Sequence, residues 1–173
     1  MLAETMEYFN IGTWLSKKIN YHLRSKKTSV KKIQVNYGEV WYCDLGYNIG
    51  TEKNKLRPVL VISNNKINQA EKVVVLSITD AKGKLNSNDL PLKDSWYLLY
   101  SDTLDDNKKI YPGRKIKNGN SPYGFLEKDS IVQCEEIKAV SKARLDATRK
   151  SIGTLASKDF KLIKQKFMRA YNL

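Results

Sequence analysis

The spacing of apolar residues near the amino terminus predicts a helix. Five large apolar side chains recur at intervals of three and four residues, which places them on one helical face. These residues are Tyr8, Ile11, Leu15, Ile19 and Leu23. Seven Lys and Arg residues lie between Lys17 and Lys32, and no acid occurs between Glu7 and Glu39. We therefore expect residues 1–35 to form an amphipathic helix and a basic linker, either solvated or in contact with RNA or a partner.

The pattern changes to short strand-like runs from Tyr37 onward. GEVWYCDL, RPVLVIS and KVVVLSIT are rich in β-branched or aromatic residues, and SIVQCEEIKAV at 130–140 is similar. Residues 81–122 alternate turn signals with one short apolar run, WYLLY at 96–100. This pattern predicts several strands in close succession and a long excursion that contains one further strand.

A second helix is predicted at the carboxyl terminus. Ser157 could cap this helix, and its apolar residues share one helical face. They are Phe160, Ile163, Phe167 and Tyr171. The predicted fold class is mainly β with α, a small barrel with a C-terminal helix and an extra N-terminal helix. The barrel domain is expected to span 36–173.

The charge of the chain indicates a polyanionic or acidic partner. Thirty-one Lys and Arg residues against 18 Asp and Glu residues give a net charge of +13. That partner could be nucleic acid, anionic lipid or an acidic protein. No segment has the roughly 18 to 20 apolar residues that a membrane span needs, and Glu4 and Glu7 lie where a signal peptide would be basic and then apolar. A cytoplasmic protein without a membrane segment is expected.

The chemistry available to the chain is restricted. His22 is the only histidine and lies in the predicted N-terminal helix, which excludes a two-histidine or Ser/His/Asp mechanism in the barrel. Neighbouring acids at 105–106 and 135–136 would point to opposite faces of an extended segment, so no metal site is expected. Cys43 and Cys134 have no Cys or His at ligand spacing and are predicted to be buried thiols.

Two residues at strand ends have chemistry that suits a phosphate. Arg57 begins one predicted strand, and Thr79 ends the next. A guanidinium group can hold a phosphate at two points, and a hydroxyl group can donate to the same oxygens. Both could equally be ordinary surface residues. The residues by themselves therefore support a basic β-barrel that binds RNA or DNA.

Two separated blocks of the sequence resemble the MazF/PemK family of toxins. GEVWYCDLGYNIGTEKNKLRPVLVISNN is similar to the opening of these toxins, and YGFLEKDSIVQCEEIKAVSKARL is similar to their second block, in the same order and spacing. The resemblance covers residues 37–80 and 121–145, and it implies an SH3-like barrel that forms a homodimer. Residues 93–119 and 1–35 have no counterpart in the shortest members, so an insertion is expected near 93–119.

The resemblance also implies roles for individual residues. Arg57 would be the catalytic arginine, and Thr79 would bind the scissile phosphate. Further RNA contacts are expected from Thr51, Glu52, Lys53, Lys55, Ser63, Asn64, Lys82, Glu135 and Glu136. Lys53 and Glu136 stand where the family commonly has Gln, which leaves the preferred RNA sequence open.

The function implied is that of the toxin in a type II toxin-antitoxin system. Such a toxin would be an endoribonuclease that cleaves single-stranded RNA to 2′,3′-cyclic phosphate and 5′-OH ends without a metal or cofactor. An acidic antitoxin protein would hold it silent. Two alternatives remain open: a non-catalytic nucleic-acid-binding SH3-like module, and a gyrase inhibitor similar to CcdB, for which Tyr171 would be the C-terminal aromatic contact.

Overall fold

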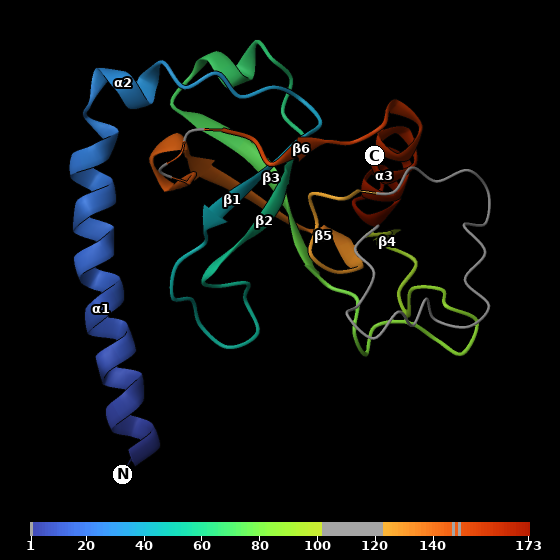
Figure 1. Cartoon of the computed structure of the whole chain (residues 1–173), viewed down its shortest axis with the longest axis horizontal. Helices are drawn as coiled ribbons and strands as arrows, with labels where there is room; N and C mark the ends of the chain where they lie inside the picture. Colours follow the sequence, from blue (N-terminus) through green and yellow to red (C-terminus); the bar gives the residue numbers. More distant parts are fainter. Residues whose placement is uncertain (1, 102–122, 147, 149) are drawn as a thin grey trace.

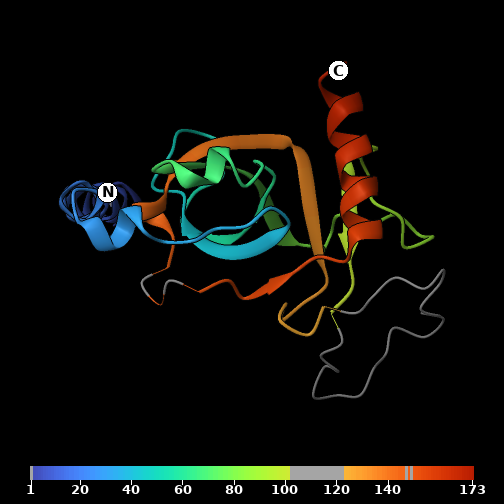
Figure 2. The same cartoon turned by 90° about the horizontal axis from the view of Figure 1, so that it is seen from above.

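Antiparallel strands form one strongly curled sheet. The computed structural model describes residues 2–101, 123–146, 148 and 150–173, without the side chains of residues 2–4. Within these residues the strands are β1 (Glu39–Asp44), β2 (Leu56–Val61), β3 (Lys72–Asp80), β4 (Trp96–Leu99), β5 (Ser130–Ser141) and β6 (Gly153–Thr154). They lie side by side in the order β4-β5-β3-β2-β1-β6 (Figures 1 and 2). The predicted fold class, mainly β with helices added, is confirmed.

Helices lie at opposite sides of the curled sheet. The long helix α1 (Leu2–Ser25) and the single turn α2 (Thr28–Lys31) lie at one side, and α3 (Ser157–Ala170) lies at the other (Figure 2). Two short 3-10 turns, η1 (Ile67–Gln69) and η2 (Lys142–Arg144), follow β2 and β5. The prediction that Ser157 caps α3 is wrong, because Ser157 is the first helical residue and Ala156 occupies the cap position without a side-chain hydrogen bond.

Alternation along the strands divides the apolar core into two main clusters. Val59 and Val75 lie in the cluster inside the curl, whereas Leu60 and Leu76 lie in the cluster on the outer face of the sheet. Successive residues of a strand point to opposite faces, which explains the division. The outer cluster includes Phe160 and Ile163 of α3. The helix therefore covers the outer face and leaves the inner face to other segments.

A buried carboxylate fastens α3 to the sheet. Asp159 is 1% exposed and accepts a hydrogen bond of 2.7 Å from the Tyr97 hydroxyl and another from the Tyr123 hydroxyl. The Tyr123 oxygen in turn accepts a bond of 3.2 Å from the Ala156 amide just before α3. Burial and these hydrogen bonds to Asp159 raise the pKa of both tyrosines above the ordinary value. Three separate segments are joined by this network.

The first helix is present as predicted, but its apolar stripe does not face the barrel. Tyr8, Ile11, Leu15, Ile19 and Leu23 are 43% to 75% exposed. An amphipathic helix usually buries its apolar stripe. Here a different side of α1, which carries aromatic and basic residues, contacts the barrel, and the stripe is left exposed.

Other expectations have mixed outcomes. Cys43 and Cys134 are buried free thiols, as predicted, and burial raises the pKa of each to about 12. In the expected insertion near 93–119, residues 93–101 are described and contain β4, whereas residues 102–119 lie outside the described residues. The acids at 105–106 also lie outside them. In the described part of the chain, no helix has the length and apolarity to cross a bilayer.

Candidate active site

Arg57 and Thr79 share one face of the sheet on neighbouring strands. In the antiparallel pairing of β2 with β3, Val59 lies opposite Ser77 and Val61 lies opposite Val75. If this register is continued by two residues, Arg57 comes opposite Thr79. Both side chains then occupy the inner face, on the same side of the sheet as Val59 and Val75. The fold thus brings the two predicted catalytic residues together.

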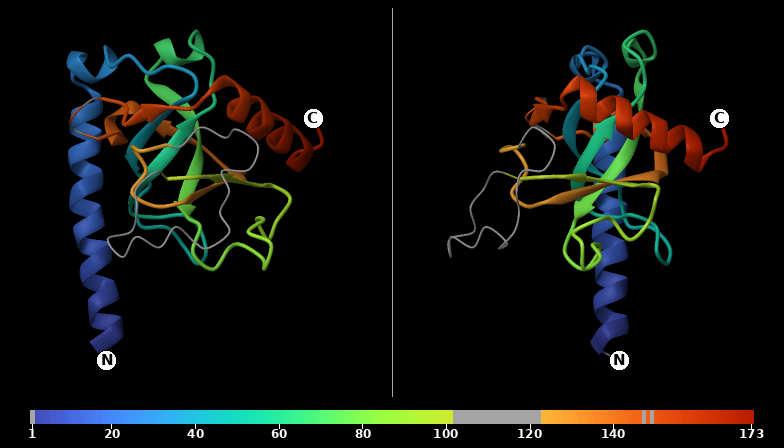
Figure 3. Two further views of the ribbon diagram at one scale, coloured as in Figure 1. Left: turned by 45° about the vertical axis from the view of Figure 1, so that its right-hand side comes forward. Right: turned by 90° about the vertical axis from the view of Figure 1, so that its right-hand side faces the viewer.

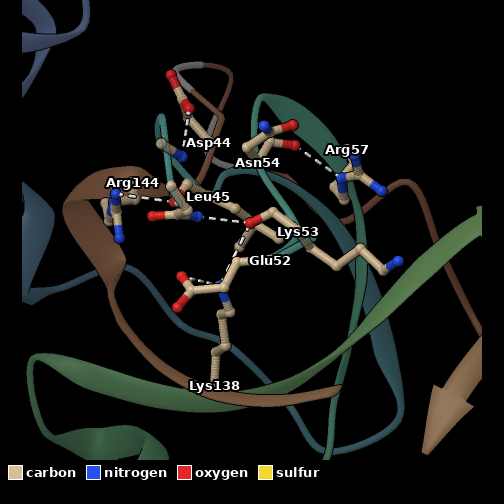
Figure 4. Close-up of polar contacts among 10 residues, drawn as sticks. Asp44, Leu45, Glu52, Lys53, Asn54, Arg57, Lys138 and Arg144 are labelled. Atoms are coloured by element: carbon tan, nitrogen blue, oxygen red, sulfur yellow. Dashed lines mark hydrogen bonds and ion pairs between the residues drawn. The ribbon is translucent and has the colours of Figure 1, made fainter. Parts of the chain in front are cut away.

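The Arg57 guanidinium is held at one end. Its Nε donates a hydrogen bond of 2.9 Å to the backbone oxygen of Asn54 (Figure 4). Burial lowers the Arg57 pKa, and the nearby Glu136 carboxylate opposes that shift by favouring the charged form. Among the described contacts, the two terminal amino groups of Arg57 have no hydrogen-bond partner. These donors are the ones that could bind two oxygens of a phosphate.

The loop between β1 and β2 is folded over this face. Leu45 N donates to Lys55 O at 3.0 Å, and Lys55 N donates to Gly46 O at 2.7 Å, which closes the loop at its base. Lys138 of β5 donates to Lys53 O at 3.2 Å and lies 3.9 Å from the Glu52 carboxylate. Figure 4 shows this arrangement, with the loop held between β5 and Arg57.

The predicted RNA-binding residues do not all lie at this loop. Thr51, Glu52, Lys53 and Lys55 all belong to the loop that contacts Arg57 through Asn54. By contrast, two of the others lie at the far end of β2, and their polar groups bond within the chain. These are Ser63, whose hydroxyl donates to Asn68 at 2.5 Å and accepts from the Val74 amide at 2.9 Å, and Asn64, whose side chain accepts from the Ile67 amide at 3.0 Å.

Glu135 and Glu136 lie in an irregular part of β5 and have different neighbours. Between Leu76 and Ser77 of β3 the pairing partner in β5 changes from Ile137 to Gln133, so residues 134–136 are extra. Glu136 lies close enough to Arg57 to affect its pKa, whereas Glu135 accepts a 2.6 Å hydrogen bond from the Trp96 indole. Glu136, and not Glu135, is therefore the acid of this irregular segment that influences Arg57.

The surroundings of Glu135 include Tyr171, the residue that the gyrase-inhibitor alternative would use to contact gyrase. Burial would raise the Glu135 pKa, but hydrogen bonds from its own backbone, Trp96 and Ser95, together with the Lys93 charge, lower it. The Tyr171 hydroxyl donates to the backbone oxygen of Glu135 at 2.7 Å. Tyr171 thus fastens the segment after α3 to β5. This structural role explains the position of Tyr171 without a contact to gyrase.

Lys82 lies just beyond the end of β3, two residues after Asp80, which lines a small pocket. Its amide donates to the Asp80 carboxylate at 2.8 Å. The pocket, of about 230 Å³, is lined by Arg57 and Thr79 together with residues that the sequence did not single out. These are Tyr42, Pro58, Ile78, Asp80, Leu126, Glu127, Lys128 and Ser130. Tyr42 pairs with Pro58, and Pro58 shares the outer face of the sheet with Leu60. The pocket therefore lies at the outer face and extends to the strand ends where Arg57 and Thr79 are found.

Asn54 and Lys138 are the main site residues that sequence reasoning missed. Asn54 acts through its backbone oxygen, which carries no side-chain signal, and Lys138 is separated from its loop partners by 85 positions. Lys138 lies opposite Val75, which places it on the inner face beside the site. The strand alternation could have indicated its face, but the sequence does not tell which loop lies above it.

A larger groove runs between α3 and the segment after β2. It has a volume of about 740 Å³, and Ser63 and Asn64 form part of its lining with Phe160, Ile163 and Phe167. Within the described residues, no group of three or more His, Cys, Asp or Glu side chains is arranged to hold a metal ion. The groove is mainly apolar and lies apart from Arg57.

Arg57 and Thr79 thus lie on the inner face of a curled antiparallel sheet. Residues 36–171 match the family described as the PemK-like, MazF-like toxin of type II toxin-antitoxin systems. The chain belongs to this family and is therefore a MazF-like toxin of such a system. A comparison with curated proteins found no match.

Solved structures share the fold at low sequence identity. An endoribonuclease in complex with its cognate antitoxin from a mycobacterial species is 19% identical, with a TM-score of 0.52 over 80% of this chain and 96% of that one. The Mycobacterium tuberculosis toxin MazF-mt6 is 16% identical, with a TM-score of 0.50 over 78% and 97%. MazF from Deinococcus radiodurans is 13% identical, with a TM-score of 0.50 over 80% and 97%. These likenesses confirm the fold.

Proposed function

We propose that this toxin is an endoribonuclease that cuts single-stranded RNA without a metal ion. The observation that carries the proposal is the placement of Arg57 and Thr79 on adjacent strands and the same face, under the loop that contains Lys53 and Lys55. A guanidinium group with free donors beside a hydroxyl group can bind the oxygens of one phosphate. Basic loop residues would hold the flanking RNA backbone.

The proposed step is attack of a ribose 2′-OH on the adjacent phosphorus. A bond forms between the 2′ oxygen and phosphorus, and the bond from phosphorus to the 5′ oxygen breaks. The 2′-OH loses its proton, and the departing 5′ oxygen gains one, so the products are a 2′,3′-cyclic phosphate and a 5′-OH. Arg57 would stabilise the negative charge that develops on the phosphorane oxygens, and Thr79 would donate to one of them.

The charge of the chain supports the proposed partners. With +13 overall, RNA and an acidic antitoxin segment are both attracted to the same toxin, so antitoxin binding over the Arg57 face would exclude RNA. By family resemblance the toxin acts as a homodimer in the cytoplasm, and residues 1–35 form a unit added to a barrel domain at 36–173. The loop residues 51–55, with Lys82 and Glu136, would form most of the RNA contacts.

Removal of the Thr79 hydroxyl is expected to slow cleavage. Thr79→Ala should lower the single-turnover rate on a labelled RNA by roughly 10²-fold, in the range typical for loss of one oxyanion donor. Thr79→Ser keeps the hydroxyl group and should remain within a few-fold of the unaltered protein. Thermal melting of each variant checks the fold. Equal losses in the Ser and Ala variants would show that the hydroxyl group takes no part.

A further inference from the structure

Helix α1 contacts the barrel at the base of the loop that covers Arg57. The Tyr21 hydroxyl donates to Asp44 Oδ2 at 2.9 Å, and the other oxygen of Asp44 accepts from the Gly46 amide at 3.0 Å. Asp44 is the last residue of β1 and is buried. Burial and the Asp44 carboxylate raise the Tyr21 pKa to about 12, so the phenol stays a donor at neutral pH. This contact fixes the point where the loop leaves the sheet.

Trp14, seven residues before Tyr21 in α1, packs against the same loop base. Its ring lies 5.1 Å from the Arg144 guanidinium carbon, and Arg144 Nη2 donates to Leu45 O at 3.2 Å. A Cβ added to Gly46, whose φ is +100°, would lie 2.7 Å from Trp14 Cζ2. The ring therefore rests directly on the loop backbone, at a position where both the space and the conformation require Gly.

Few residues separate this contact from the arginine. Gly46 O accepts from Lys55 N at 2.7 Å, and the residue before Lys55 is Asn54, whose oxygen accepts from Arg57 Nε at 2.9 Å. The path from Trp14 to Arg57 thus runs through backbone groups that are hydrogen-bonded across the loop base. A shift of the loop at Gly46 would move the acceptor that orients the guanidinium.

We propose that Trp14 and Tyr21 are positioning residues of the active site, through which α1 holds the 45–55 loop and thereby orients Arg57. The catalytic part of this inference rests on the proposed function, whereas the loop-holding part does not. Reactions that depend on alignment lose rate when a group is misplaced by about 1 Å, even if binding is kept. Loss of these contacts should therefore lower kcat more than it raises KM.

Amide hydrogen exchange and kinetics together test this inference on the full-length chain. Trp14→Ala and Tyr21→Phe should increase exchange of the Leu45, Gly46 and Lys55 amides at least tenfold, while amides in the middle of β3 remain protected. Both variants should lower kcat roughly tenfold or more, with KM changed less than threefold. Trp14→Phe should restore part of both properties, because it keeps an aromatic ring.

Phe9→Ala is the matched control, since Phe9 is an aromatic residue of α1 that is 69% exposed. It should change neither loop exchange nor kcat. Unchanged exchange at 45–55 in Trp14→Ala and Tyr21→Phe would overturn the inference, as would an equal loss of protection across the whole barrel. If the unaltered protein does not cut RNA, the proposed function fails, but the exchange data still decide whether α1 holds the loop.

A separate observation concerns the outer face of α1. The exposed stripe from Tyr8 to Leu23 is centred near Leu15, whereas the contacts with the barrel are made by Trp14, Tyr21 and Arg24 on another side of the helix. Figures 1 and 3 show α1 at one edge of the molecule, with no described segment on its outer side. The helix is also divided in charge. Residues 1–16 contain two acids and no Lys or Arg, whereas residues 17–27 contain five Lys and Arg and no acid.

We infer that this outer face pairs antiparallel with α1 of a second copy of the chain. In that arrangement Leu15 meets its own counterpart, Ile11 meets Ile19, and the acidic half of each helix lies beside the basic half of the other. A parallel arrangement would place like charges together, which is unfavourable. Because each barrel lies on the opposite side of its own α1, two barrels would point away from each other.

Disulfide cross-linking of the full-length protein tests this pairing. Cys43 and Cys134 are buried, so an introduced surface thiol reports on the helix. Under mild oxidation Leu15→Cys should cross-link to itself, and Tyr8→Cys should cross-link to Leu23→Cys when the two variants are mixed. Leu90→Cys, at an equally exposed site outside α1, is the control. The inference fails if Leu15→Cys links no more than Leu90→Cys, or if Tyr8→Cys links mainly to itself.

Discussion

Arg57→Ala is expected to abolish most RNA cleavage while the fold stays intact. The side chain is half-buried, and its described hydrogen bond goes to the backbone of Asn54. It would act on charge that appears only in the transition state. Loss of one neutral oxyanion donor typically costs roughly 10² to 10³ in rate, and a charged fork with two donors should cost more than that.

Arg57→Lys should restore only part of the rate. A point charge on a flexible chain cannot donate to Asn54 O and to two phosphate oxygens with the same geometry. The measurement is single-turnover cleavage of a labelled RNA, with thermal melting beside it. Lys72→Ala, which removes an exposed charge at the opposite end of β3, should cleave at close to the unaltered rate. Full activity in Arg57→Ala would remove this residue from the mechanism.

Asp159→Ala is expected to produce a large loss of stability in the barrel. The carboxylate is 1% exposed and accepts hydrogen bonds from both Tyr97 and Tyr123. Its removal leaves two buried hydroxyl groups without this partner, each at a cost of about 1 to 3 kcal/mol. A total of about 2 to 6 kcal/mol should lower Tm by roughly 4 to 20 °C for a domain of this size.

Thermal and urea unfolding measure this effect. Asp159→Asn should be intermediate, because its amide oxygen can accept from one tyrosine while its NH2 group cannot accept from the other. Lys161→Ala, an exposed change on the same helix, should alter Tm little. A Tm for Asp159→Ala equal to that of Lys161→Ala would show that the buried network does not hold α3 to the sheet.

The strands could be predicted because their residues carry the signal locally. Runs such as KVVVLSITD are rich in β-branched residues, and β3 spans that run. The position of Arg57 relative to Thr79 follows once β2 and β3 pair in antiparallel register, since residues at corresponding distances from Val59 and Ser77 come together. Local pattern and strand geometry therefore sufficed to place this pair.

The contacts of α1 could not be predicted from its apolar pattern. Periodicity identified a helix and its apolar stripe, but the barrel is contacted by Trp14, Tyr21 and Arg24 on another side. Such contacts join residues 23 to 130 positions apart and depend on where the loop base and η2 come to lie. The Asp159 network could not be predicted for the same reason, because Asp159 is 62 positions from Tyr97 and 36 positions from Tyr123.

The sequence also could not show how two of the predicted RNA-binding residues are bonded within the chain. The family resemblance implied that Ser63 and Asn64 contact RNA, and in the structure their polar groups bond to Asn68 and to the Ile67 amide. The Asn64 side chain accepts from the first amide of η1, while Lys66 occupies the cap position of that turn without a side-chain hydrogen bond. Whether either also contacts RNA stays a prediction.

End-group analysis of cleaved RNA tests the central claim most directly. The purified protein is incubated with a single-stranded RNA in the presence of EDTA, beside Arg57→Ala under the same conditions. The account predicts that the unaltered protein yields fragments with 2′,3′-cyclic phosphate and 5′-OH ends at an undiminished rate, and that Arg57→Ala yields almost none. Cleavage that stops when divalent ions are chelated, or products with 5′-phosphate ends, would contradict the proposed mechanism.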